Sequence, residues 1–141
     1  MNLNNIWFLT GFLVAITTAG SFALTYLLPI DIRFSSIIIL VASTMFLGYY
    51  YTSKTRKVMH ESLRKGVAIR YTIIQVIIGA IILYLLLPIL SAAGIFGSFI
   101  TAIMIGLVIF VAFLNYFIVY FALKTGGESY LRGQSIKKKR R

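Results

Sequence analysis

The sequence predicts an all-α, polytopic membrane protein with four transmembrane helices and both termini in the cytoplasm. The chain of 141 residues is 60% hydrophobic and 12% charged, whereas soluble domains carry about 45–50% apolar and about 25% charged residues. Its mean hydropathy is +0.93. The 14 Lys and Arg residues outnumber the 3 Asp and Glu residues and gather in two blocks, which indicates membrane orientation before nucleic-acid binding.

Four apolar stretches are long enough to cross a hydrocarbon core of about 30 Å, which takes roughly 18 residues or more. They cover residues 6–28, 34–51, 71–90 and 99–122, and none contains a charged residue or a histidine. Because lipid offers no hydrogen bonds to backbone groups, stretches of this kind must be helices. We therefore expect a single four-helix transmembrane domain over residues 1–141.

Breaks in the apolar pattern set the expected connections. Pro29 ends the first helix, Pro88 and the small residues of 91–98 turn the third helix into the fourth, and Gly126 with Gly127 stops the fourth. This division leaves a basic loop over residues 52–70 and a basic tail over residues 123–141.

The positive-inside rule places this loop and tail in the cytoplasm. The two segments hold every cation except Arg33. We expect two groups within them to contact the headgroups of anionic lipids or a partner, namely Lys54, Arg56, Lys57, Arg64, Lys65 and Arg70 in the loop, and Lys137, Lys138, Lys139, Arg140 and Arg141 in the tail. For the tail, lipid is the favoured partner, ahead of a sorting receptor that reads a dilysine signal. We do not expect the tail to bind nucleic acid, because no aromatic stacking platform accompanies it.

The loop also has a helical pattern of its own. Met59, Leu63 and Val67 share one side at helical spacing, so the segment either lies on the inner leaflet or extends the third helix. Glu61 can pair with Lys57 or Lys65 at a spacing of four.

Two stripes of small residues recur at four-residue spacing. Such stripes let helix backbones approach closely in lipid. The expected helix-packing residues are Gly11, Ala15, Ala19 and Ala23 in the first helix, and Ser98, Ala102 and Gly106 in the fourth. Packing within the chain is the favoured interpretation, and a homodimer is the alternative.

Gln75 and Asn115 are uncharged polar residues at similar depths in the third and fourth helices. The favoured interpretation is a hydrogen bond between the two side chains that joins the helices. In the alternative, they line a polar substrate path together with Ser43 and Thr44.

Enzyme chemistry finds little support in the sequence. The chain has no cysteine, one histidine and three carboxylates, and no glycine-rich phosphate loop or nucleophile elbow. We therefore expect no catalytic residues, no cofactor and no metal ion.

Several residues carry a resemblance to a family. They are Ser35 and Ser36 at the start of the second helix, Gly48 and Tyr51 at its end, Arg56, Glu61 and Arg64 in the loop, and the segment 120–127 after the fourth helix. In these positions the chain resembles a family of four-helix inner-membrane proteins of Gram-negative bacteria without an assigned activity. The resemblance implies a multi-pass protein of the bacterial inner membrane.

From these observations we expect a non-enzymatic protein of the cell envelope. It would bind membrane lipids, another membrane protein or a second copy of itself through its helix faces and basic cytoplasmic surface. A small transporter or exporter without a buried carboxylate is the alternative, and a holin-like pore former is the second alternative.

Overall fold

The structure, a computed structural model, is all-α and describes residues 5–27, 32–92 and 98–139. Its helices are α1 (Ile6–Leu27), α2 (Ile32–Thr55), α3 (Glu61–Ala92) and α4 (Ser98–Lys139). Each of these four helices is long and apolar enough to cross a membrane. The structure therefore confirms an all-α chain with four helices that are long and apolar enough to span a membrane, while the turn at Pro29 lies outside the described residues.

The helix boundaries differ from the predicted ones at the charged end of the molecule. α3 has 32 residues and α4 has 42 residues, which makes them about 48 Å and 63 Å long at about 1.5 Å per residue. The predicted loop over 52–70 shrinks to residues 56–60, and the predicted tail is helical as far as Lys139. Pro88 lies inside α3 and does not end it.

Local contacts account for the short connection between α2 and α3. Arg56 has a left-handed backbone (φ 59°), and its N–H donates to the Thr52 carbonyl at 2.8 Å, which closes the last turn of α2. At the start of α3, the Ser62 N–H donates to His60 Nδ1 at 3.4 Å. Lys65 Nζ lies 2.6 Å from Glu61 Oε1, so Glu61 forms one of its two predicted ion pairs.

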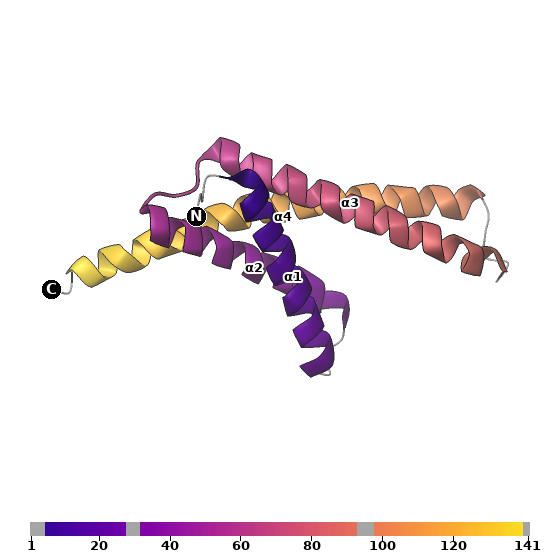
Figure 1. Cartoon of the computed structure of the whole chain (residues 1–141), viewed down its shortest axis with the longest axis horizontal. Coiled ribbons are helices and arrows are strands. Elements are labelled where there is room, and N and C mark those ends of the chain that lie inside the picture. Colours follow the sequence, from indigo (N-terminus) through magenta and orange to yellow (C-terminus); the bar gives the residue numbers. More distant parts are fainter. Residues whose placement is uncertain (1–4, 28–31, 93–97, 140–141) are drawn as a thin grey trace.

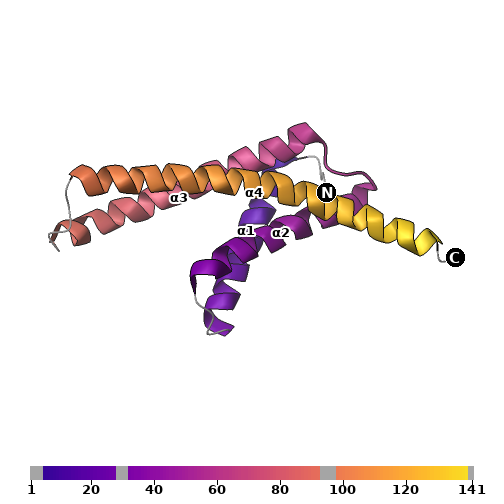
Figure 2. The ribbon, with the colours of Figure 1, turned by 180° about the vertical axis from the view of Figure 1, so that it is seen from behind.

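The four helices meet at one crossing, from which two hairpins diverge (Figures 1 and 2). α1 packs against α2 and α3, and α4 packs against α2 and α3, whereas within the described chain α1 does not contact α4 and α2 does not contact α3. This ring of contacts is that of a four-helix bundle. It is restricted to the crossing, because the α1/α2 arm and the α3/α4 arm point in different directions beyond it.

The buried core lies at this crossing and draws on every helix. Its members are Leu9 and Leu13 of α1, Leu40, Leu47 and Tyr51 of α2, Met59 of the connection, Val67, Ala68 and Tyr71 of α3, and Val119 and Leu123 of α4. Met59 and Val67 thus belong to the core, and Leu63 packs against it. The apolar side of this segment packs against other helices. Of the two predicted placements, on the inner leaflet or as an extension of the third helix, the structure shows the extension.

Glycines make the closest helix contact, between α2 and α4. A Cβ added at Gly126 would overlap the Met45 carbonyl, one added at Gly48 would overlap the Leu123 carbonyl, and one added at Gly127 would lie 2.7 Å from Thr52 Oγ1. The prediction that Gly126 and Gly127 end the fourth helix is therefore wrong. They lie within α4 because they let its backbone approach α2.

The predicted small-residue stripes do not form this contact. A Cβ at Gly11 or Gly106 would meet nothing within 4 Å, and Ala15, Ala19, Ala23 and Ala102 are exposed. The side chain of Ser98 lies outside the described part. The described members of both stripes are exposed, so packing within the chain is the wrong interpretation for them.

Candidate functional site

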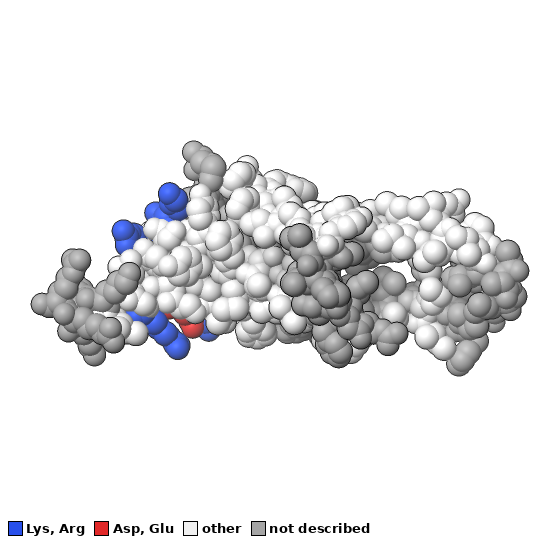
Figure 3. Space-filling view, turned by 90° about the horizontal axis from the view of Figure 1, so that it is seen from below, with Lys and Arg blue, Asp and Glu red and all other residues white. Residues whose placement is uncertain are grey.

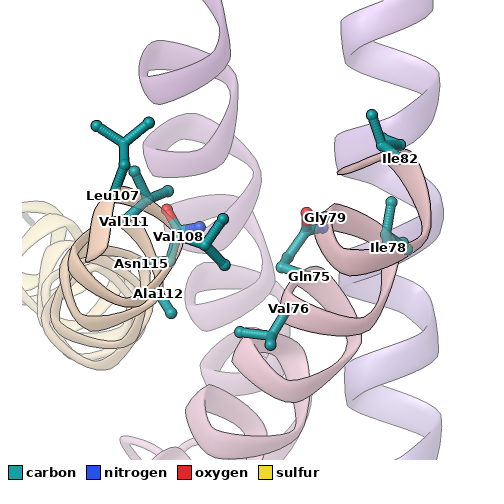
Figure 4. A pocket seen from close by; sticks show the side chains of 10 residues that line it. All are labelled: Gln75, Val76, Ile78, Gly79, Ile82, Leu107, Val108, Val111, Ala112 and Asn115. Atoms are coloured by element: carbon teal, nitrogen blue, oxygen red, sulfur yellow. The ribbon is translucent and has the colours of Figure 1, made fainter. Parts of the chain in front are cut away.

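A pocket of about 260 Å³ lies between α3 and α4, and along both helices the crossing lies between the pocket and the charged residues. Gln75 projects into it from α3 and Asn115 from α4, so that the two amides lie on facing walls (Figure 4). The remaining lining residues are apolar, namely Val76, Ile78, Gly79 and Ile82 of α3, and Leu107, Val108, Val111 and Ala112 of α4.

Small residues keep the two helices from filling this space. Gly79 has no side chain, and a Cβ built there would meet nothing within 4 Å. Ala112 contributes only a methyl group from the opposite wall. Nearer the crossing, larger side chains close the gap, since Tyr71 and Val119 belong to the core.

The pocket is polar at one end and apolar along the rest of its length. Gln75 and Asn115 lie at the end nearest the crossing, and Ile82 and Leu107 lie about 10 Å farther along the antiparallel helices. Ile78, Ile82 and Leu107 are 42%, 52% and 62% exposed, so the pocket opens on the outer surface of the α3/α4 arm.

The structure brings Gln75 and Asn115 together as the sequence predicts, but not through a direct bond. Among the described side chains no hydrogen bond joins the two amides, because the pocket separates them. The Tyr71 hydroxyl instead lies within hydrogen-bonding reach of the Gln75 and Thr17 side chains.

Ser43 and Thr44, the other two residues of the predicted polar path, are placed elsewhere. Both are buried in α2, and neither lines the pocket. The Thr44 hydroxyl donates to the Leu40 carbonyl at 2.6 Å, which satisfies it within its own helix. The four residues therefore do not form one path.

The exposed cations gather at one end of the molecule, which we call the basic end (Figure 3). Of the predicted contact residues, Lys54, Arg56, Lys57 and Lys65 are exposed there. Arg56 Nη1 donates to the Tyr130 hydroxyl at 3.0 Å, which ties the end of α2 to α4. Arg70 is half-buried, with its guanidinium 4.4 Å from the centre of the Trp7 ring. The side chains of residues 137–141 lie outside the described part.

Arg64 does not belong with these exposed cations. It is 9% exposed and its guanidinium lies 5.0 Å from the centre of the Tyr120 ring. Nε and Nη1 are buried without a hydrogen-bond partner. The prediction of a lipid contact is wrong for this position because α3 begins at Glu61, which places Arg64 on the same helix face as Ala68 and Tyr71, toward α4.

The glycine contact and the buried Arg64 are the features that sequence reasoning missed. A signal for the first was available, because Gly48, Gly126 and Gly127 lie near the charged end of two different helices and so at similar depth. No family model, no curated protein and no solved structure matches this chain. The resemblance to the four-helix inner-membrane proteins thus stays a prediction.

Proposed function

We propose that the chain is a non-enzymatic integral protein of the bacterial inner membrane that associates with other membrane proteins of the envelope. The observation that carries this proposal is the α3/α4 arm, which extends from the crossing with large apolar side chains exposed on both helices. Among them, Ile81 and Tyr84 of α3 and Phe110 and Phe113 of α4 are more than half exposed. In a bilayer such faces are open to lipid and to the helices of other proteins.

The charge distribution supports an orientation with the basic end and both termini in the cytoplasm. Exposed lysines and arginines cluster where α2 ends, where α3 begins and along the last third of α4, and the opposite end of the α3/α4 arm has no charged side chain among its described residues. The positive-inside rule relates this asymmetry to topology, and anionic lipids would attract the same surface.

The orientation can be tested by cysteine labelling, because the native chain has no cysteine. Ser135→Cys marks the basic end, and Tyr26→Cys marks the far end of α1. We expect a membrane-impermeant maleimide added to cells with a permeabilised outer membrane to label Tyr26→Cys alone, and Ser135→Cys only after the inner membrane is opened. Labelling of Ser135→Cys in intact spheroplasts would contradict the proposal.

The association can be tested by photocrosslinking in native membranes. A benzophenone amino acid at Phe113, on the α3/α4 arm, should capture a specific membrane protein that mass spectrometry identifies. The matched control places the same group at Phe22 of α1, which is 64% exposed against 61% for Phe113. Capture of lipid alone at Phe113, or of the same proteins from both positions, would argue against a partner on this arm.

Transport is the second candidate function, and the pocket is the observation that favours it. Gln75 and Asn115 could hold an uncharged polar substrate. Gln75→Leu combined with Asn115→Leu should then abolish flux in proteoliposomes at an unchanged protein level. Without measurable flux in the unmodified protein, this candidate fails.

A further inference from the structure

The lining of the pocket between α3 and α4 is too apolar to hold ordered water throughout. The pocket volume of about 260 Å³ has room for several water molecules. A buried water needs two to four polar partners, and the pocket offers only the two amides of Gln75 and Asn115. A bilayer also provides a hydrocarbon chain at its open side, so the pocket has an apolar occupant within reach.

The residues that line the pocket indicate which kind of molecule it can hold. Each amide offers N–H donors and a carbonyl acceptor, and no charged side chain lines the pocket. An uncharged carbonyl group therefore suits the polar end. From there the walls are apolar toward Gly79 and Ile82 on one helix and Leu107 on the other, in the direction away from the basic end. The pocket thus matches a molecule with a carbonyl at the cytoplasmic side and a chain that points to the bilayer centre.

We propose that this pocket binds one lipid, whose uncharged carbonyl accepts hydrogen bonds from the Gln75 and Asn115 amides and whose hydrocarbon chain lies against Gly79. Two membrane components share this chemistry, the ester group of a glycerolipid and the ring carbonyl of an isoprenoid quinone. The inference rests on the proposed insertion into the bilayer, and it does not depend on a protein partner.

A substitution at Gly79 tests directly whether the pocket binds this lipid. A leucine there would occupy the pocket, and the backbone offers no obstacle because nothing lies within 4 Å of an added Cβ. Gly106 is the matched control, since it is also open within 4 Å but is exposed and does not line the pocket. Both substitutions replace glycine by leucine in an apolar stretch of the same arm.

The experiment is native mass spectrometry of the full chain released from mild detergent, with extraction and identification of the bound lipid. We expect one lipid per chain in the unmodified protein and in Gly106→Leu, and none in Gly79→Leu. Gln75→Leu combined with Asn115→Leu should weaken retention roughly tenfold or more, since each lost hydrogen bond contributes about 1 kcal/mol and about 1.4 kcal/mol is tenfold. The mass of the lipid distinguishes a glycerolipid from a quinone.

Equal lipid retention in Gly79→Leu and the unmodified protein would overturn the proposal, as would an unmodified protein that retains no lipid. Thermal unfolding of each variant shows whether it is folded, and the Ser135→Cys label shows whether it is inserted in the expected orientation. If Gly79→Leu misfolds, Gly79→Val supplies a smaller substituent in the same space. A failure of lipid binding is thereby separated from a failure of insertion, and photocrosslinking at Phe113 tests the partner independently.

Discussion

The crossing and the α3/α4 arm are both built from apolar helices but are held together in different ways. In the candidate membrane span of α2, 44% of the residues are buried, whereas in those of α3 and α4 only 6% are buried. The two more apolar spans are the less buried ones. Hydropathy alone therefore does not mark the core of this protein, which contains small and hydroxyl-bearing residues such as Gly48, Thr10 and Thr52 beside its leucines.

The largest expected difference between the two regions follows from deleting a leucine side chain. Leu123 is fully buried at the crossing and Leu107 is 62% exposed on the arm. Leu123→Ala should lower the free energy of unfolding by about 2–5 kcal/mol through the cavity it leaves. Leu107→Ala, the matched control, should change it by less than about 0.5 kcal/mol. Thermal unfolding in detergent, followed by the fluorescence of the single tryptophan, Trp7, measures the stability of both variants. Equal effects would contradict the difference in packing between the crossing and the arm.

Replacement of a glycine by alanine compares the crossing with the arm through the effect of a single added methyl group. Gly126→Ala should cost about 1–3 kcal/mol, because its Cβ meets the Met45 carbonyl and α2 must move away from α4. Gly106→Ala should instead stabilise the protein by up to about 1 kcal/mol, since alanine favours a helix and the space around Gly106 is open. The same unfolding assay measures both variants. A neutral Gly126→Ala would show that the two helices approach less closely than described.

Arg64 tests whether the crossing contains a destabilising feature. Arg64→Met loses the contact with Tyr120 but removes two buried, unpaired nitrogen atoms, each of which costs about 1–3 kcal/mol. We therefore expect a net gain of about 1 kcal/mol and a higher unfolding temperature. A clear loss of stability would mean that the contact with Tyr120 outweighs the cost of the two unpaired nitrogen atoms.

The smallest effect is expected at the exposed ion pair of α3. Glu61 and Lys65 have side chains that are 55% and 51% exposed, and solvent screens such pairs. Glu61→Gln should leave the unfolding temperature unchanged within error, at low and at high salt. A salt-dependent decrease would indicate that Glu61 supports the start of α3 more strongly than its exposure implies.

The sequence predicts the helices of this protein better than their ends and their contacts. The four spans follow from apolar length, because the bilayer sets a minimum number of residues. The ends of α3 and α4 do not follow from apolar length. Lys, Arg and Glu at helical spacing are as compatible with a helix that continues into water as with a loop. Gly126 and Gly127 illustrate the same ambiguity, because glycine ends a helix in solution and joins helices in lipid.

For the candidate site, the sequence predicts the residues but not the geometry. The depth and polarity of Gln75 and Asn115 are enough to predict that they belong to one site, and the structure places both in one pocket. The pocket itself depends on Gly79 of α3 and Ala112 of α4 both lining the space between the two helices. That register is a tertiary property, so it could not be read from either helix separately. Polarity alone groups Ser43 and Thr44 with the two amides, although both are buried in α2 away from the pocket.

α4 is one uninterrupted rod that carries both the pocket wall and the charged surface. Asn115 and Arg132 belong to this single helix, about 25 Å apart along its axis. Because α4 is a single continuous helix, any rotation of α4 when the pocket fills would also move the cations of the basic end. Gly126 and Gly127, where α4 packs closely against α2, lie between the two positions, so such a rotation would turn about this contact.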